Sequence, residues 1–140
     1  MKKIILTSIA LCLLLFACNQ TKKIVAETPV APLSGFFNVV TINGENISPT
    51  ALLQFNRADK KISGNAGCND FSGKYTQDAG SLNIGLLTST KMYCDGAMKN
   101  EYAIQRVLKD VGSFDISNGT LTLYSGIEKK PLLTALKNKQ

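Results

Sequence analysis

Apolar and polar residues alternate with a period of two through much of the chain after residue 50. The alternation is clearest in the segments ALLQFN (51–56), SLNIG (81–85), SFDIS (113–117) and TLTLY (120–124). Successive side chains of a strand point to opposite faces of a sheet, so this period is typical of strands with one buried and one solvated face. We therefore expect these segments to be β-strands.

Short turn signals separate the expected strands. They are Asn43-Gly44, Asp78-Ala79-Gly80 and Asn118-Gly119. Asn-Gly readily adopts the positive φ that tight hairpin turns require. Several short antiparallel strands at close spacing favour a small barrel or sandwich. The expected fold class is therefore mainly β.

A further segment carries the period of an α-helix. Between residues 97 and 111, apolar residues recur on one side of the expected helix: Ala97, Ile104, Val107, Leu108 and Val111. Asp95 is placed to cap its N-terminus, and Gly112 stands where a helix commonly ends. We expect one helix at about 97–111 that covers a mouth or an open edge of the sheet, with its apolar stripe in the core.

The N-terminus has the features of an export signal. Lys2 and Lys3 precede an uncharged, mostly apolar run of 13 residues, Ile4 to Phe16. A membrane-spanning helix needs about 20 apolar residues, so this run has instead the length of a signal-peptide core. The residues Leu15-Phe16-Ala17-Cys18 resemble a bacterial lipobox, which implies a lipoprotein signal peptide at 1–17 and a lipidated Cys18. An ordinary secretory signal cut nearby is the alternative.

Residues 18–32 are expected to form a tether. Pro29 and Pro32 fall in a stretch without apolar periodicity, and proline restricts both its own φ and the residue before it. The folded domain is then 33–140. We expect an exported protein that Cys18 holds on a membrane of the cell envelope, the outer membrane of a Gram-negative bacterium.

The charge pattern gives no sign of a nucleic-acid partner. The chain has 16 basic and 10 acidic residues, and the loss of Lys2 and Lys3 with the signal peptide leaves a net charge of +4. The lysines are scattered, which is typical of a solvated surface. We expect no nucleic-acid binding, because no such motif is present and an exported protein would rarely meet its target.

Cys68 and Cys94 are the cysteines left in the folded domain, because Cys12 is removed with the signal peptide and Cys18 carries the lipid. Disulfides persist in an exported, oxidising environment. Structural zinc needs four Cys or His ligands, and the chain contains no histidine. We therefore expect a Cys68–Cys94 disulfide, which would join the glycine-rich segment around Cys68 (residues 62–84) to the start of the helix. We expect no metal site.

The sequence offers no catalytic constellation. A serine or cysteine triad lacks its histidine base. In TSTK, Thr88 stands where the Ser-x-x-Lys spacing needs serine, since Ser89 is too close to Lys91. Nothing selects a carboxylate pair for glycosidic chemistry. We expect no enzymatic activity and no cofactor.

The segment from Ser63 to Leu108 resembles the META domain, the family of the heat-inducible HslJ-like envelope proteins. The matching motif residues are Gly67, Cys68, Asn69, Gly73, Tyr75, Leu82, Thr90, Met92, Cys94, Glu101 and Leu108. The resemblance implies a compact antiparallel β-barrel-like, lipocalin-like sheet with one helix. We expect Tyr75, Leu82 and Met92 to face the core, and Asn69 to bond neighbouring backbone groups in a turn.

These observations predict a non-catalytic, lipid-anchored and monomeric envelope domain. The resemblance implies that it would support envelope integrity, or stress and drug tolerance, by binding a protein or another envelope component. The alternative is a carrier that holds a small apolar ligand inside a lipocalin-like barrel.

Overall fold

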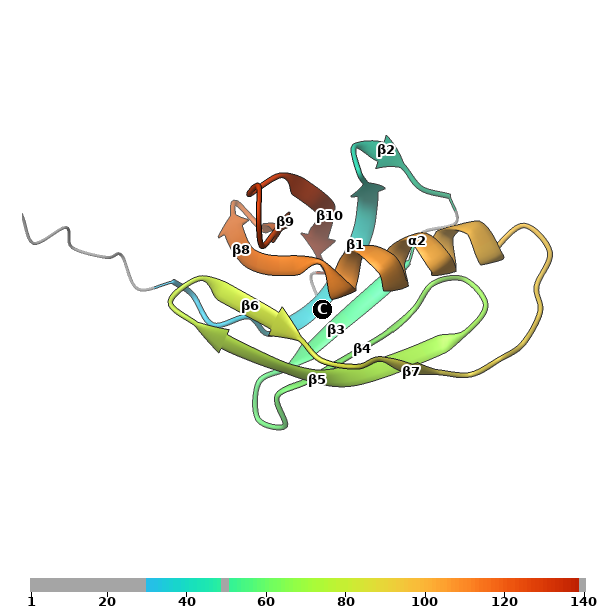
Figure 1. Cartoon of the computed structure of the whole chain (residues 1–140), viewed down its shortest axis with the longest axis horizontal. Helices are drawn as coiled ribbons and strands as arrows, with labels where there is room; N and C mark the ends of the chain where they lie inside the picture. The colour runs from blue at the N-terminus through green and yellow to red at the C-terminus, as the bar shows by residue number, and fades with distance from the viewer. Residues whose placement is uncertain (1–29, 49–50, 139–140) are drawn as a thin grey trace, which may run out of the picture.

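The strands form a closed antiparallel barrel of eight, in the order β1-β3-β4-β5-β6-β8-β9-β10 (Figure 1). The computed structural model describes residues 30–48 and 51–138. The strands are β1 (Gly35–Ile42), β2 (Glu45–Asn46), β3 (Leu52–Asn56), β4 (Lys61–Asn65), β5 (Asp70–Asp78), β6 (Ser81–Ile84), β7 (Thr88–Ser89), β8 (Val111–Ser117), β9 (Thr120–Ser125) and β10 (Pro131–Lys137), and the helix is α2 (Met98–Lys109). Among the residues described, the mainly β fold with one helix is thus confirmed.

The barrel closes through strands from opposite ends of the domain. β1 pairs with β10 in a register that runs from Phe37 opposite Lys137 to Ile42 opposite Leu133. On the other side of the barrel, β6 and β8 are joined by a single pair, Ser81 opposite Ser113. The short strands β2 and β7 lie off this circuit and pair with β1 and β5.

The expected hairpin turns are present. Asn43 and Gly44 have φ values of 51° and 84°, and Asn118 and Gly119 have 51° and 79°. Both central residues of each turn thus have the positive φ that matches the twist of hairpin strands. At the turn between β5 and β6, Ala79 takes a φ of 41° before Gly80.

The turn between β3 and β4 contains no glycine, and the sequence pattern did not reveal it. Asn56 Oδ1 accepts hydrogen bonds from the backbone N–H groups of Ala58 and Asp59 at 3.0 and 3.2 Å. Lys60 then takes a φ of 49°. An asparagine side chain therefore fixes this turn, in the manner of an Asx-turn.

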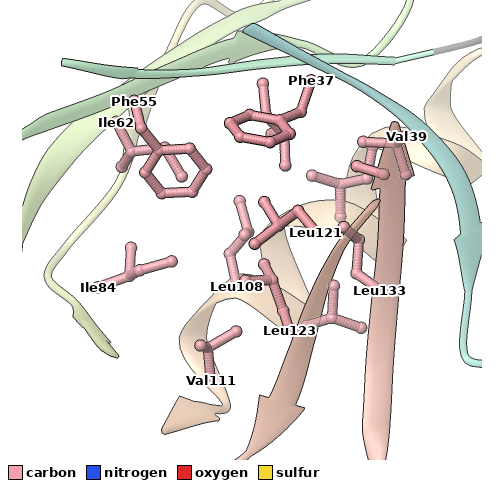
Figure 2. Packing of buried hydrophobic residues seen from close by; sticks show 14 of the residues in the cluster. Phe37, Val39, Phe55, Ile62, Ile84, Leu108, Val111, Leu121, Leu123 and Leu133 are labelled. Atoms are coloured by element: carbon pink, nitrogen blue, oxygen red, sulfur yellow. The ribbon is translucent and has the colours of Figure 1, made fainter. Parts of the chain in front are cut away.

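The barrel interior is filled by the chain's own side chains (Figure 2). Phe55 makes edge-to-face contacts with Phe37 and Tyr75, with ring centroids 6.0 and 5.4 Å apart. Below them in Figure 2, Leu121 and Leu123 point into the same core from β9. Phe55, Leu121 and Leu123 are apolar positions of the period-two pattern, so the sequence predicted the core face of β3 and β9.

The helix contributes Ile104, Val107 and Leu108 to this core. Figure 2 shows Leu108 beside Leu121 and Leu123. The apolar stripe of the helix therefore packs inward, as the sequence predicted.

Both predicted helix boundaries need correction. Ala97 occupies the N-cap position and no side chain caps the helix, whereas Asp95 lies in the preceding turn with Gly96 at φ 78°. The helix ends at Lys109, and the N–H of Asp110 donates to the carbonyl of Val107 at 3.1 Å. Gly112 is not the helix stop, because it already belongs to β8.

Leu33 is the first fully buried residue of the described chain. Its N–H donates to Gln77 Oε1 at 3.0 Å, and its carbonyl accepts from the Tyr75 hydroxyl at 3.0 Å. Burial raises the pKa of the Tyr75 phenol above 10.0, and the nearby Arg57 charge opposes this shift. The segment before β1 is thus fixed to β5.

Within residues 30–48 and 51–138, no helix combines the length and apolar character needed to cross a membrane. Cys18 and most of the expected tether lie outside the described residues.

Candidate functional site

Part of the sequence motif meets where three segments come together: the connection from β4 to β5, the segment that follows β7, and α2. The residues that meet there are Cys68, Asn69, Thr90, Met92, Cys94 and Glu101. Cys68 and Cys94 form a disulfide between the first two segments, with their Cα atoms 5.8 Å apart. The bridge predicted from the two cysteines is thus confirmed. It joins the chain before β5 to the turn that begins the helix.

Asn69 is buried beside this disulfide and uses its whole amide group. Its Oδ1 accepts from Thr90 Oγ1 and from the N–H of Met92, both at 2.7 Å. Its Nδ2 donates to the carbonyl of Met92 at 2.9 Å and to Glu101 Oε2 at 2.8 Å. A primary amide offers two donors and one carbonyl oxygen with two lone pairs, so Asn69 has no bonding capacity left. We call these four residues the Asn69 cluster.

Glu101 is an unusual buried residue because it is a carboxylic acid with 4% exposure. It accepts hydrogen bonds from Asn69 Nδ2 and, at 3.3 Å, from Gln105 Nε2 one turn further along the helix. Its place in the first turn of α2 also suits a negative charge, since the N-terminal end of a helix carries a partial positive charge. Its neighbours therefore satisfy the carboxylate within the protein.

Two of our expectations about this motif were wrong. Asn69 does not bond neighbouring backbone groups, because its side-chain partners lie 21 to 32 positions away in the sequence. Met92 is not a core residue, since its side chain is 59% exposed and only its backbone takes part in the Asn69 cluster. Tyr75 and Leu82 are buried, as predicted.

Gly67 makes the tight turn before Cys68. It has a φ of 106°, a conformation that residues with a Cβ rarely adopt, and its N–H donates to Asn65 Oδ1 at 2.8 Å. Glycine is therefore required where the chain turns to bring Cys68 and Asn69 to the helix.

Gly64 and Gly73 lie in β4 and β5, where neighbouring groups approach closely. A Cβ at Gly73 would lie 2.8 Å from both the carbonyl oxygen of Leu86 and a methyl of Leu87. A Cβ at Gly64 would overlap the Leu52 carbonyl oxygen. Both glycines thus make room for packed neighbours.

Side chains with catalytic potential take part in local structural contacts. Asp59 accepts from Asn56 Nδ2 at 2.8 Å, and Asp70 accepts from Asn65 Nδ2 at 2.7 Å. Thr88 Oγ1 donates to the carbonyl of Ser72. In the part of the chain that the structure describes, no group of three His, Cys, Asp or Glu residues is placed to bind a metal ion. These contacts hold neighbouring segments of the chain together.

The Asn69 cluster borders a surface hollow of about 350 Å³. Tyr93 and Tyr102 line it with exposed fractions of 83% and 65%, and the exposed Met92 side chain lies with them. The buried network therefore fixes the backbone beneath a group of apolar surface side chains.

Fold and site together define a small antiparallel barrel whose helix is held to the sheet by a disulfide and a buried amide network. The chain belongs to the META domain family, which it matches over residues 31–139. The match includes the whole barrel, and the resemblance seen in the sequence motif is thus confirmed. No curated protein matches the sequence significantly.

Solved structures share this fold. One protein studied by NMR is 27% identical, and the alignment covers 73% of this chain and 88% of that chain with a TM-score of 0.54. An NMR structure of a protein from Burkholderia xenovorans is 18% identical over 79% of this chain and 94% of that one, with a TM-score of 0.59. A crystal structure of a DUF4847 family protein from Bacteroides vulgatus ATCC 8482 is 18% identical over 76% and 94%, with a TM-score of 0.54.

Proposed function

We propose that this protein is a non-catalytic, lipid-anchored domain of the bacterial cell envelope that binds a protein or another envelope component. The anchor is Cys18, at the end of the lipobox-like sequence, and the barrel is the part that meets the partner. In this role the domain supports the envelope under stress. We expect it to act as a monomer on the outer membrane of a Gram-negative bacterium.

One observation carries the non-catalytic part of the proposal. The buried polar side chains, Asn69 and Glu101, bond to each other and to Thr90, Met92 and Gln105. A catalytic acid or base must instead reach the substrate. Together with the Cys68–Cys94 disulfide, these bonds favour a rigid scaffold that offers its surface for binding.

The carrier alternative receives less support. A carrier barrel needs interior space, whereas Phe37, Phe55, Leu121 and Leu123 meet across this interior with exposures of 2% or less (Figure 2). Protein interiors are packed nearly as densely as organic crystals, so side chains of this size leave little room for a ligand. The outer surface is therefore the better place for a partner.

Membrane fractionation tests the anchor. The full chain and its Cys18→Ala variant would be expressed in a Gram-negative host, and the inner and outer membranes would be separated. We expect the full chain in the outer-membrane fraction, resistant to extraction by salt. We expect the Cys18→Ala variant to leave that fraction, because it lacks the lipidated residue.

Equal distribution of both proteins would contradict the lipid anchor. A hydrolase or transferase activity of the purified protein that a single substitution abolishes would contradict the non-catalytic role. Crosslinking in stressed cells, followed by comparison with Cys18→Ala, would then identify the bound component.

A further inference from the structure

A shallow groove of about 590 Å³ runs across the outer face of the sheet formed by β3, β4, β5 and β7. It lies on the surface opposite the apolar core, because the inward residues of these strands alternate with the residues that line the groove. The lining side chains are mostly hydroxyls and amides: Gln54, Ser63, Asn65, Ser72, Thr88, Ser89 and Thr90.

Strand register places the central lining residues in one row. Gln54 lies opposite Ser63, Ser63 opposite Ser72, and Ser72 opposite Thr88. Neighbouring strands are about 4.8 Å apart, so three spacings give a row of about 14 Å. All four side chains are uncharged, and three of them are small hydroxyl residues. The face is therefore hollow where longer side chains would fill it.

A second row lies beside the first. Leu52 is opposite Asn65, and Asn65 is opposite Asp70. Thr90 extends this row, since its Oγ1 accepts from the N–H of Asp70 at 3.2 Å and its N–H donates to the Asp70 carbonyl at 3.1 Å. Several of the polar groups in the two rows also bond within the protein: Ser63 Oγ donates to Gln54 Oε1 at 3.3 Å, Thr90 Oγ1 donates to Asn69 Oδ1, and Thr88 Oγ1 donates to the Ser72 carbonyl. The groove therefore offers a ligand mainly the Gln54 amide N–H groups, the Ser72 and Ser89 hydroxyls and the remaining lone pairs of the other side chains.

The charge of the groove is balanced, although the protein as a whole is basic. Lys61 and Asp70 are its charged lining residues, and Asp70 is bonded to Asn65 Nδ2 at 2.7 Å. Anionic ligands such as phosphate-rich polymers are recognised by several cations together. One lysine therefore does not suit a highly charged partner.

A peptide strand also fits the groove poorly. Strand addition needs a free row of backbone N–H and C=O groups. In β4 and β5 these groups already pair within the sheet, from Leu52 opposite Asn65 to Lys61 opposite Lys74. Leu52 is the partly exposed apolar lining residue, and Phe71 is 3% exposed, so apolar anchors for a peptide are few.

The other surface hollows carry less information. The hollow beside Tyr93 and Tyr102 is rich in apolar side chains, but nothing in the structure indicates what covers it. The hollow of about 520 Å³ between β6 and β8 includes Gly80, Gly112 and Gly126, which offer few side-chain groups for recognition.

We propose that the groove between Gln54 and Thr88 binds a neutral oligosaccharide segment of an envelope glycan. Sugar hydroxyl and acetamido groups donate and accept hydrogen bonds, as do the serine, threonine and amide side chains of the two rows. Backbone hydrogen bonds between neighbouring strands hold the groove in place, so binding would cost little conformational entropy in the protein. This inference rests on the proposed envelope function, and it names the class of component bound.

NMR titration of the full chain tests the site. The ¹⁵N-labelled protein, in a zwitterionic detergent without a sugar head group, would be titrated with triacetylchitotriose and with maltotriose. We expect saturable shifts at Gln54, Ser63, Ser72 and Thr88 with at least one of the two sugars. A neutral peptide of serine and threonine serves as the competing class of ligand.

Ser72→Ile is the variant that blocks the groove, because it removes the central hydroxyl and adds bulk on an outward strand position. The matched control is Thr122→Ile, on the partly exposed face of β9 and outside the groove. We expect Ser72→Ile to weaken sugar binding about tenfold or more, through lost hydrogen bonds and lost space, and Thr122→Ile to leave it unchanged. Isoleucine suits a strand at both positions, and thermal unfolding of the two variants will check that they remain folded.

Three results would overturn the proposal: no saturable shift with either sugar, shifts confined to the surface around Tyr93 and Tyr102, or groove binding by the peptide alone. Failure here would leave the membrane fractionation result intact. A soluble wild-type chain that nevertheless binds the sugar in this groove would instead contradict the lipid anchor alone.

Discussion

Asn69 and Glu101 are 32 residues apart in the sequence, and their buried side chains meet beneath the surface, with Asn69 Nδ2 2.8 Å from Glu101 Oε2. Asn69 comes directly after the disulfide-bonded Cys68, and Glu101 lies in the first turn of α2. The contact therefore joins the sheet to the helix at the place where a covalent bridge already joins their flanking segments. The disulfide and the Asn69–Glu101 hydrogen bond therefore hold the same parts of the sheet and the helix in place.

Replacement of Asn69 by aspartate should disrupt this contact. The variant loses both N–H donors and places a second carboxylate against Glu101 and the Met92 carbonyl. Buried acceptors without donors are costly, so we expect the free energy of unfolding to fall by about 3 kcal/mol or more. Urea denaturation of the wild type and the variant at neutral pH measures this loss of unfolding free energy.

Asn83→Asp is the matched control, because Asn83 is exposed on β6 and undergoes the same chemical change. It should change stability by about 0.5 kcal/mol or less. The double variant Asn69→Asp, Glu101→Gln restores a donor opposite an acceptor, and it should regain part of the loss. Equal stability of Asn69→Asp and Asn83→Asp would contradict the role of the amide.

Removal of the disulfide should destabilise the domain by a different route. Cys68 and Cys94 are separated by 26 positions, and loop-closure entropy assigns a bridge of this span about 3.5 kcal/mol. We expect the Cys68→Ala, Cys94→Ala double variant to lose about this amount in urea denaturation. In the exported wild-type protein, both thiols should resist alkylation until a reductant is added. Alkylation of the unreduced, folded protein would contradict the bridge.

The sequence predicted the barrel better than it predicted the Asn69 cluster. Period-two alternation marks the inward face of a strand directly, and Asn-Gly turns mark the ends, so Leu121, Leu123 and the Asn118–Gly119 turn followed from local rules. Asn69 bonds partners far along the chain, and no local pattern encodes such contacts. The sequence motif identified the residue but not its bonds.

Met92 shows why residue type alone misled the interpretation. A methionine in a motif suggests a side chain packed in the core. In this motif, however, Asn69 bonds the backbone N–H and C=O of Met92 and not its side chain. The polar groove was missed for a related reason. Its rows form across strands, so Ser63 and Ser72 become neighbours only when the register is known.

The Tyr75 phenol should make stability depend on pH at the alkaline end. Its pKa is raised by burial, so the folded state holds the phenolic proton more tightly than the unfolded state does. Stability from this group is fully present below pH 10 and declines as pH rises through the folded-state pKa, because the unfolded chain then binds fewer protons.

Tyr75→Phe tests this dependence. At pH 7 it should lose about 1 kcal/mol, because the hydrogen bond from the hydroxyl to the Leu33 carbonyl is absent. Above pH 10 the gap between wild type and variant should narrow. Tyr93→Phe, at an exposed position, provides the control and should follow the wild type at every pH. A gap that stays constant through the alkaline range would contradict the assignment.

The contact between Gly112 and Gly126 gives the last prediction, because it is unequal in its two directions. A Cβ at Gly112 would overlap the Cα of Gly126 and lie 2.9 Å from its nitrogen. A Cβ at Gly126 would lie 3.5 Å from the Cα of Gly112, an ordinary contact. The backbone cannot separate easily, since the N–H of Gly126 donates to the Asp110 carbonyl at 3.1 Å.

We therefore expect Gly112→Ala to lower the free energy of unfolding by about 2 kcal/mol or more, in the range of overpacked sites. Gly126→Ala should be nearly neutral, because it adds the same methyl group on the side with room. Thermal unfolding of the two variants measures the difference. A loss at Gly112 alone is expected, because the backbone atoms of Gly126 have no space to move away from a methyl group there. Similar losses for both variants would contradict this prediction and would show that β8 and the turn after β9 move apart locally.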